Sequence, residues 1–303
     1  MHIYLPIAGQ SVNALFIVLL GFGVGLLSGM FGIGGGFLTT PLLIFYGIPP
    51  AVAVASATTQ ITGASVSGAM VHMRRGGVDM KMAGVMIVGG FLGSVAGAFI
   101  FRMLLSSGQV DVVISFLYVL ILGWIGTIML KDALTALGLI PGKPAEAGAP
   151  RHNRWVASLP LRWRFYSSGL YISPLAPVAI GFLAGVMTVL LGIGGGFILV
   201  PAMIYVLGMP ARVVIGTSLA MVLAVSAATT MVNALTTRTV DVVLAGLLLV
   251  GGVIGAQYGA LMTTRLKPDH VRLALAIIIL LVGLRMLLGL TWRPDEIFSI
   301  EYL

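Results

Sequence analysis

Long apolar stretches recur along most of the chain, and they restrict its fold more than any other feature. A helix needs about 20 mostly apolar residues to cross a bilayer. Stretches near this length run over residues 12–31, 51–72, 82–105, 111–130, 175–191, 211–235, 241–264 and 270–290. Only 9% of the residues are charged, which is too few for the surface of a soluble domain. The sequence therefore predicts an all-α polytopic membrane protein.

A glycine-rich hexapeptide occurs twice in the chain. The sequence Gly-Ile-Gly-Gly-Gly-Phe occupies residues 32–37 and again 192–197, and a proline follows each copy at the same distance, as Pro41 and Pro201. Each copy leads into an apolar segment of about ten residues, which is too short to cross a bilayer as an ordinary helix. The chain therefore contains an internal repeat.

The match continues beyond these motifs as far as Gly97 and Gly259. It pairs Gly47-Ile48-Pro49 with Gly208-Met209-Pro210, Val78-Asp79 with Val240-Asp241, and Gly84, Gly89, Gly90, Gly93 and Gly97 with Gly246, Gly251, Gly252, Gly255 and Gly259. We therefore expect two homologous transmembrane repeats, residues 1–131 and 175–303, each with about four long helices and one short broken segment. Glycines at every fourth position, as at 89, 93 and 97, are typical of close helix packing.

The segment that joins the repeats, residues 132–174, is the most basic part of the chain. Basic loops stay in the cytoplasm, so this linker is predicted to be cytoplasmic, with its later, aromatic part at the membrane interface. If each repeat crosses an odd number of times, Arg74, Arg75, Lys81 and the basic residues of 265–272 become cytoplasmic too. The charges thus favour inverted over parallel repeats.

The first apolar stretch is expected to be a retained helix of the cytoplasmic (inner) membrane. No charged residue precedes Arg74, so the stretch lacks the basic flank of a cleavable signal peptide.

The glycine triplets predict breaks in the helices, because glycine and the following proline disfavour a continuous helix. Unwound backbone at membrane depth is tolerated only inside protein or beside a water-filled cavity. The short helix after each break would direct free amides and its positive dipole end at that cavity, which suits an anion. The alternative, that these glycines serve only close packing, stays open.

Small polar residues on the helix that follows each break would complete such a site. The predicted substrate-binding residues are Gly34, Gly35, Gly36, Thr58, Thr59, Gln60, Gly194, Gly195, Gly196, Thr217 and Ser218. Serine and threonine in membranes more often bond to other parts of the helices, so this assignment has a purely structural alternative.

Two further matched pairs have alternative interpretations. His72 and Asn233 lie near helix ends, where they would gate or attract an anion, or simply mark the interface. Asp79 and Asp241 stand at predicted helix starts, where a carboxylate stabilises the helix dipole, with proton carriage as the alternative.

Several classes of function lack support. The excess of 17 Lys and Arg over 9 Asp and Glu forms no basic stripe, so nucleic-acid binding is not indicated. Cysteine is absent, and a nucleotide-binding Gly-x-Gly-x-x-Gly motif would need glycine where Phe37 and Phe197 stand. Ser65 and His72, the candidate pair for an intramembrane enzyme, are roughly 10 Å apart along one helix. We expect no enzyme activity, no cofactor and no metal site.

The doubled glycine-triplet-to-proline motif, Gly216-Thr217-Ser218 and the basic linker resemble the TauE/SafE sulfite exporter family over about residues 16–290. The resemblance implies transport of a small sulfur-containing anion, such as sulfite, a sulfonate or sulfoacetate, across the cytoplasmic membrane, driven by an ion gradient. The first repeat departs from the pattern with Ala55-Ser56-Ala57, so Ser56 is not expected to have the role of Thr217.

The leading hypothesis is therefore a secondary transporter that works by alternating access and holds its anion at the glycine-rich breaks. A passive anion channel is the nearest alternative, because no buried carboxylate pair or clear cation site indicates coupling. The sequence leaves open a coupling proton or sodium ion, and it also leaves open a homodimer.

Overall fold

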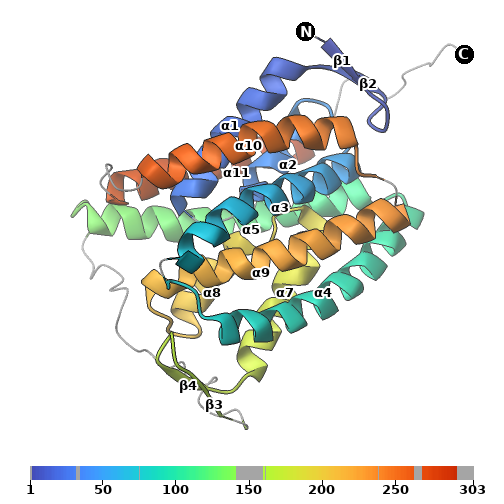
Figure 1. Cartoon of the computed structure of the whole chain (residues 1–303). Helices are drawn as coiled ribbons and strands as arrows, with labels where there is room; N and C mark the ends of the chain where they lie inside the picture. The colour runs from blue at the N-terminus through green and yellow to red at the C-terminus, as the bar shows by residue number, and fades with distance from the viewer. Residues whose placement is uncertain are drawn as a thin grey trace, which may run out of the picture.

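The computed structural model describes residues 2–31, 35–74, 76–140, 160, 162–237, 239–262 and 268–291. In the first half the helices are α1 (Ala14–Phe31), α2 (Gly36–Phe45), α3 (Pro50–Arg74), α4 (Met80–Ser106) and α5 (Val110–Ala136). In the second half they are α7 (Leu175–Leu191), α8 (Gly196–Tyr205), α9 (Ala211–Val232) with the π-helical turn η1 (Asn233–Thr237), α10 (Val242–Met262) and α11 (Pro268–Thr291). Figure 1 shows them packed into one helical bundle.

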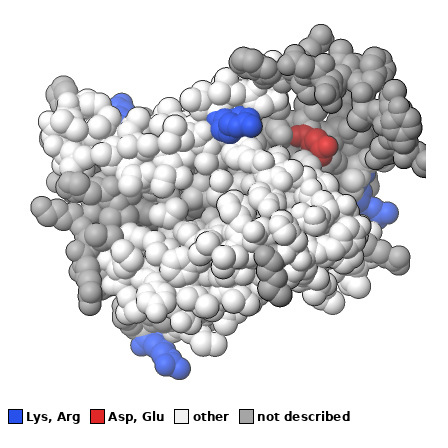
Figure 2. All heavy atoms as spheres, turned by 90° about the horizontal axis from the view of Figure 1, so that it is seen from above, with Lys and Arg blue, Asp and Glu red and all other residues white. Residues whose placement is uncertain are grey.

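The predicted helical membrane architecture is confirmed. Each long apolar stretch forms a helix within a few residues of its expected ends, and each half has one short helix after its glycine motif. Among the described residues, five helices are long and apolar enough to cross a membrane. Large apolar side chains such as Phe99, Trp124 and Tyr258 are exposed, as lipid-facing residues are. Charged residues are few on the face drawn in Figure 2.

One β-hairpin precedes the first long helix of each half. Strands β1 (His2–Leu5) and β2 (Gln10–Asn13) pair antiparallel, and so do β3 (Trp163–Phe165) and β4 (Leu170–Ile172). The hairpins lie at opposite ends of the molecule (Figure 1). Residues 132–174, predicted to be a linker, contain regular structure at both ends. Helix α5 continues to Ala136, and β3 and β4 form a hairpin that matches the one at the amino terminus. Residues 141–159 lie outside the described part.

Glycines bring two pairs of helices into backbone contact. On α4, a Cβ atom added to Gly89 or Gly93 would lie 2.1 or 2.0 Å from a carbonyl oxygen of α7. On α10, a Cβ added to Gly251 or Gly255 would lie 2.1 Å from a carbonyl oxygen of α1. Only glycine allows such an approach, so the predicted packing role of these series is confirmed. Each pair joins one helix from either half.

Two pairs of corresponding helices, α3 with α9 and α5 with α11, pack antiparallel. Near its end, α3 faces the start of α9, since a Cβ on Gly68 would lie 3.0 Å from the side chain of Leu219. Gly126 of α5 faces Leu280 of α11, whereas Gly283, further along α11, faces Leu122. This packing is the geometry that inverted repeats require. The orientation of each half relative to the two sides of a membrane stays a prediction.

Candidate functional site

The second glycine motif interrupts the helix as predicted. Helix α7 ends at Leu191, and α8 begins at Gly196. Between them, Gly192, Gly194 and Gly195 have φ angles of 67°, 72° and 72°. This left-handed conformation is rarely adopted by residues with a side chain.

The first motif has the same form where it is described. Helix α1 ends at Phe31, α2 begins at Gly36, and Gly35 has a φ of 74°. The predicted site residue Gly34 lies outside the described residues, together with Gly32 and Ile33.

The two breaks meet inside the molecule. A Cβ atom on Gly36 would lie 2.3 Å from the carbonyl oxygen of Gly192, so the two backbones touch. The rings of Phe37 and Phe197, which follow Gly36 and Gly196, are stacked with centroids 4.6 Å apart and planes inclined by 8°. Both rings are almost fully buried. The starts of α2 and α8 therefore share one buried centre, which we call the central junction.

Free backbone amides lie at this junction. In α8, the amides of Ile198 and Leu199 donate to the carbonyl of Gly195, at 3.0 and 2.9 Å. The amides of Gly196 and Phe197 come before these donors and belong to the first turn, which has no intrahelical acceptors. Helix α2 begins in the same way, with its first bonds to the carbonyl of Gly35. Neither first turn contains an acidic residue, so both positive dipole ends are uncompensated there.

Side chains from neighbouring helices close the junction. Ile61 of α3 touches both breaks, since Cβ atoms on Gly36 and Gly194 would lie 2.2 and 2.8 Å from it. Ser226 Oγ of α9 would be 3.3 Å from the Cβ on Gly194. The Tyr118 hydroxyl of α5 donates to the carbonyl of Leu191, at the end of α7. Sequence reasoning assigned none of these three side chains to the site.

Another matched pair of hydroxyl residues, Ser28 and Thr188, lies beside the breaks and was not predicted from the sequence. Ser28 lies against Gly35 and Thr188 against Gly195, with hydroxyl oxygens 3.5 and 3.3 Å from the added Cβ atoms. The two residues stand 160 positions apart, which is the spacing of the glycine motifs. That spacing is the signal that could have found them.

The hydroxyls predicted to bind substrate donate their hydrogen bonds to carbonyls of their own helices. Thr58 and Thr59 of α3 donate to the carbonyl of Ala55, at 2.7 and 3.1 Å. In α9, Thr217 donates to Val213 and Ser218 to Ile215. Gln60 lies between α2 and α10: its Oε1 accepts from the Thr39 hydroxyl at 2.8 Å, and its Nε2 would be 2.8 Å from a Cβ on Gly252.

Thr217 lies away from the central junction. It precedes Ser226 by nine residues, which is about 14 Å along a helix axis. Its hydroxyl also accepts the amide of Asp79 at 2.9 Å, so it joins α9 to the segment before α4. The structure thus brings the described glycines of both breaks together, links Gln60 to α2 through Thr39, and places Thr217 near the end of the bundle.

The predicted gating residues lie at opposite ends of the α3–α9 pair. His72 is in the last turn of α3, whereas Asn233 follows the last residue of α9 and begins η1. Because α3 and α9 run antiparallel, the two residues do not meet. A gating role at either end stays a prediction.

Both matched aspartates cap helices, as expected, and each also binds a hairpin. Asp79 accepts the amide of Met82 at 3.0 Å, and its other oxygen accepts the amide and hydroxyl of Ser168 in the β3–β4 turn, at 3.1 and 2.7 Å. Asp241 accepts the amide of Leu244 at 3.1 Å and that of Ile7, in the β1–β2 turn, at 3.0 Å. Each hairpin is therefore fixed to a helix of the other half.

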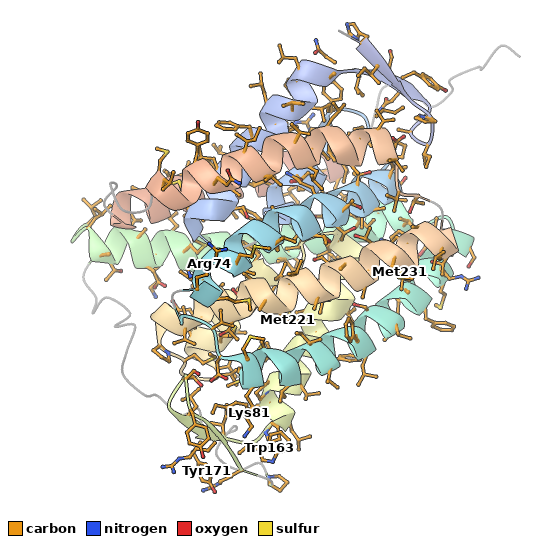
Figure 3. All side chains as sticks on the ribbon, viewed as in Figure 1. Arg74, Lys81, Trp163, Tyr171, Met221 and Met231 are labelled. Atoms are coloured by element: carbon orange, nitrogen blue, oxygen red, sulfur yellow. The ribbon has the colours of Figure 1, made fainter. Side chains whose placement is uncertain are left out.

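The β3–β4 hairpin has a second attachment to α4. The ammonium of Lys81 lies 5.3 Å from the centre of the Trp163 ring and donates to the carbonyl of Arg164 at 3.2 Å (Figure 3). Cation–π contacts of this kind stabilise partly exposed structure modestly. The described residues contain no group of three or more His, Cys, Asp or Glu side chains that could hold a metal ion.

Comparisons with known proteins agree with this architecture. The family model of the sulfite exporter TauE/SafE matches residues 17–286. The probable membrane transporter protein YunE of Bacillus subtilis is 25% identical over 91% of this chain and 98% of its own length. A probable membrane transporter protein of Xylella fastidiosa (strain Temecula1) is 31% identical over 83% of this chain and 84% of its own.

No solved structure matches the chain. The extent of the family match, together with the helical fold, shows that the chain belongs to the sulfite exporter TauE/SafE family and is a multi-pass transporter of the cytoplasmic membrane rather than an enzyme.

Proposed function

We propose that this protein carries a small sulfur-containing anion, such as sulfite, a sulfonate or sulfoacetate, and binds it at the central junction. One observation carries the proposal: two helix starts, one from each half, meet at a single buried point, where Gly36 faces Gly192 and Phe37 stacks on Phe197. Each start offers free amides and a positive dipole end. An anion between them would satisfy donors of both halves.

The chemistry of the junction suits an anion that must be released as well as bound. The described residues nearest to Cβ atoms added at the breaks are glycine, aliphatic and hydroxyl residues, and the rings at the junction are those of Phe37, Phe197 and Tyr118, so none of these is a lysine or arginine. Backbone dipoles in a low-dielectric site attract an anion without fixing it in a salt bridge. The proposed ligands are the amides of Gly34–Gly36 and Gly194–Gly196, with help from polar side chains of α3 and α9.

The arrangement of the halves supports alternating access. The described glycines of both breaks are buried, and we propose that this arrangement corresponds to a state closed to both sides. The α3–α9 and α5–α11 pairs run antiparallel, and inverted repeats of this kind can exchange conformations so that one central site opens to either side. We propose this exchange as the transport cycle, driven by a proton or sodium gradient.

Transport by the purified protein in liposomes tests the proposal. Radiolabelled sulfite and a short sulfonate would be offered with and without proton and sodium gradients. We expect saturable uptake, accumulation driven by one gradient, and faster exchange when unlabelled anion is present inside. Uptake that only equilibrates, without saturation or exchange, would identify a passive channel. Absence of anion movement under every gradient would reject the proposal.

A further inference from the structure

We infer that the hydroxyls of Ser65 and Ser226 donate hydrogen bonds to the transported anion, one from each half. This inference rests on the proposed function and names side chains for the same site. The two serines correspond in the repeat, being 161 positions apart like Gly47 and Gly208. Both are 0% exposed, and neither hydroxyl has a hydrogen-bond partner among the described residues.

The hydroxyls of Ser56 of α3 and Thr230 of α9 are also buried without a partner among the described residues, but Ser65 and Ser226 are the unpaired hydroxyls that occupy corresponding positions in the repeat. A buried serine or threonine normally bonds back to a carbonyl three or four residues earlier. Thr58, Thr62 and Ser218 in the same two helices do so, with distances of 2.7 to 2.9 Å. A buried hydroxyl without a partner lowers stability, so its presence at two corresponding positions calls for a ligand.

The position of Ser226 directs its hydroxyl to the second break. Its Oγ would be 3.3 Å from a Cβ on Gly194, one of the left-handed glycines between α7 and α8. The same Cβ would lie 2.8 Å from Ile61 of α3. A hydroxyl of α9 and a side chain of α3 therefore meet at one point of the unwound backbone.

Ser65 lies on α3, one turn beyond the residue that touches both breaks. It follows Ile61 by four residues, so the two side chains lie on one face of the helix, one turn apart. Since Ile61 touches both Gly36 and Gly194, the face that carries Ser65 is the one turned toward the breaks.

The hydrogen-bond donors available at the junction suit an oxyanion. Sulfite and the head group of a sulfonate present three oxygens that accept hydrogen bonds, and each serine hydroxyl has one proton to donate. The hydroxyls of Thr58, Thr59, Thr217 and Ser218 donate to helix carbonyls, whereas those of Ser65 and Ser226 have no acceptor among the described residues. Two neutral donors, added to the helix-start amides, would recognise the oxygens without a fixed charge.

The variants Ser65→Ala and Ser226→Ala, alone and combined, test the inference. Dissociation constants for sulfite and a short sulfonate would be measured by calorimetry in detergent, with the melting temperature of each variant. We expect each single variant to bind at least tenfold more weakly and the double variant at least a hundredfold. Melting temperatures should stay equal or rise, because an unpaired buried hydroxyl has been removed.

Thr62→Val is the matched control, since it removes an α3 hydroxyl that is already bonded to the carbonyl of Thr58. It should leave anion affinity unchanged. If both single variants and the double variant bind within twofold of the wild type, while Gly194→Ala abolishes binding, the serines are not ligands and the proposed function stands. If the wild type binds none of the anions, the proposed function and this inference fall together.

Discussion

The left-handed glycines at the breaks impose a conformation that other residues resist. Gly35 and Gly195 have φ angles of 74° and 72°, and each stands immediately before a short helix. A Cβ on Gly195 would meet Ala184 and Thr188 at 3.0 and 3.3 Å, so an added methyl has little room. The conformation of these residues therefore sets the direction of the amides that follow.

We expect Gly35→Ala and Gly195→Ala to weaken anion binding at least tenfold. The strain of a left-handed alanine is about 1–2 kcal/mol, and relieving it would turn the following amides away from the central junction. Calorimetry and thermal unfolding would separate the two effects. Gly84→Ala is the control, because its Cβ would have no atom within 4 Å and its helix should tolerate alanine. Unchanged affinity in both folded variants would contradict the prediction.

A different glycine should affect stability alone. A Cβ on Gly93 would lie 2.0 Å from the carbonyl oxygen of Phe182, so Gly93→Ala must push α4 and α7 apart. Overpacking of this kind typically costs about 1–3 kcal/mol. We expect a lower melting temperature with anion affinity kept in the protein that remains folded. A melting temperature equal to that of Gly84→Ala would show that the two helices are not in backbone contact.

At the scale of elements, the aspartate caps connect helix starts to hairpins. Asp79 is 1% exposed and accepts three hydrogen bonds, two of them from Ser168. The carboxylate therefore stabilises α4 and holds the β3–β4 turn at the same time.

Asp79→Ala should lower the free energy of unfolding by about 2 kcal/mol or more, since it removes a helix cap and leaves buried donors unpaired. Hydrogen–deuterium exchange should rise in residues 166–171 as the turn is released. Asp111→Ala serves for comparison, because Asp111 lies exposed in the first turn of α5 and contributes only a few tenths of a kcal/mol. Equal exchange in both variants would disprove the attachment.

The helices could be predicted from the sequence, whereas the hairpins could not. Apolar length locates a membrane helix closely, and the glycine triplets located both breaks. Strands of three or four residues carry too little alternation to be recognised, and the bonds that hold them join residues 234 and 89 positions apart. The Ser226 hydroxyl was missed because the rotation of α9, which decides whether Thr217 or Ser226 faces the breaks, does not follow from the sequence.

At the scale of the whole molecule, antiparallel packing of corresponding helices should place their starts on opposite sides of the membrane. Met80 and Val242 begin α4 and α10 and are 60% and 78% exposed. The chain has no cysteine, so Met80→Cys and Val242→Cys each introduce one thiol. An impermeant maleimide added to intact cells should label only one of the two. Labelling of both from the same side would disprove the inverted arrangement.

The glycine contacts between helices also bear on how such a protein could arise. Helix α4 of the first half contacts α7 of the second half through its backbone, and α10 of the second half contacts α1 of the first. Each half therefore packs its glycine-rich helix against a helix of the other half. A polypeptide with only one half would leave these glycine faces uncovered. Two identical halves inserted in opposite orientations could cover them by mutual exchange. The present chain thus has the architecture expected if an ancestral pair of oppositely oriented, interlocked subunits was fused into one gene and later diverged.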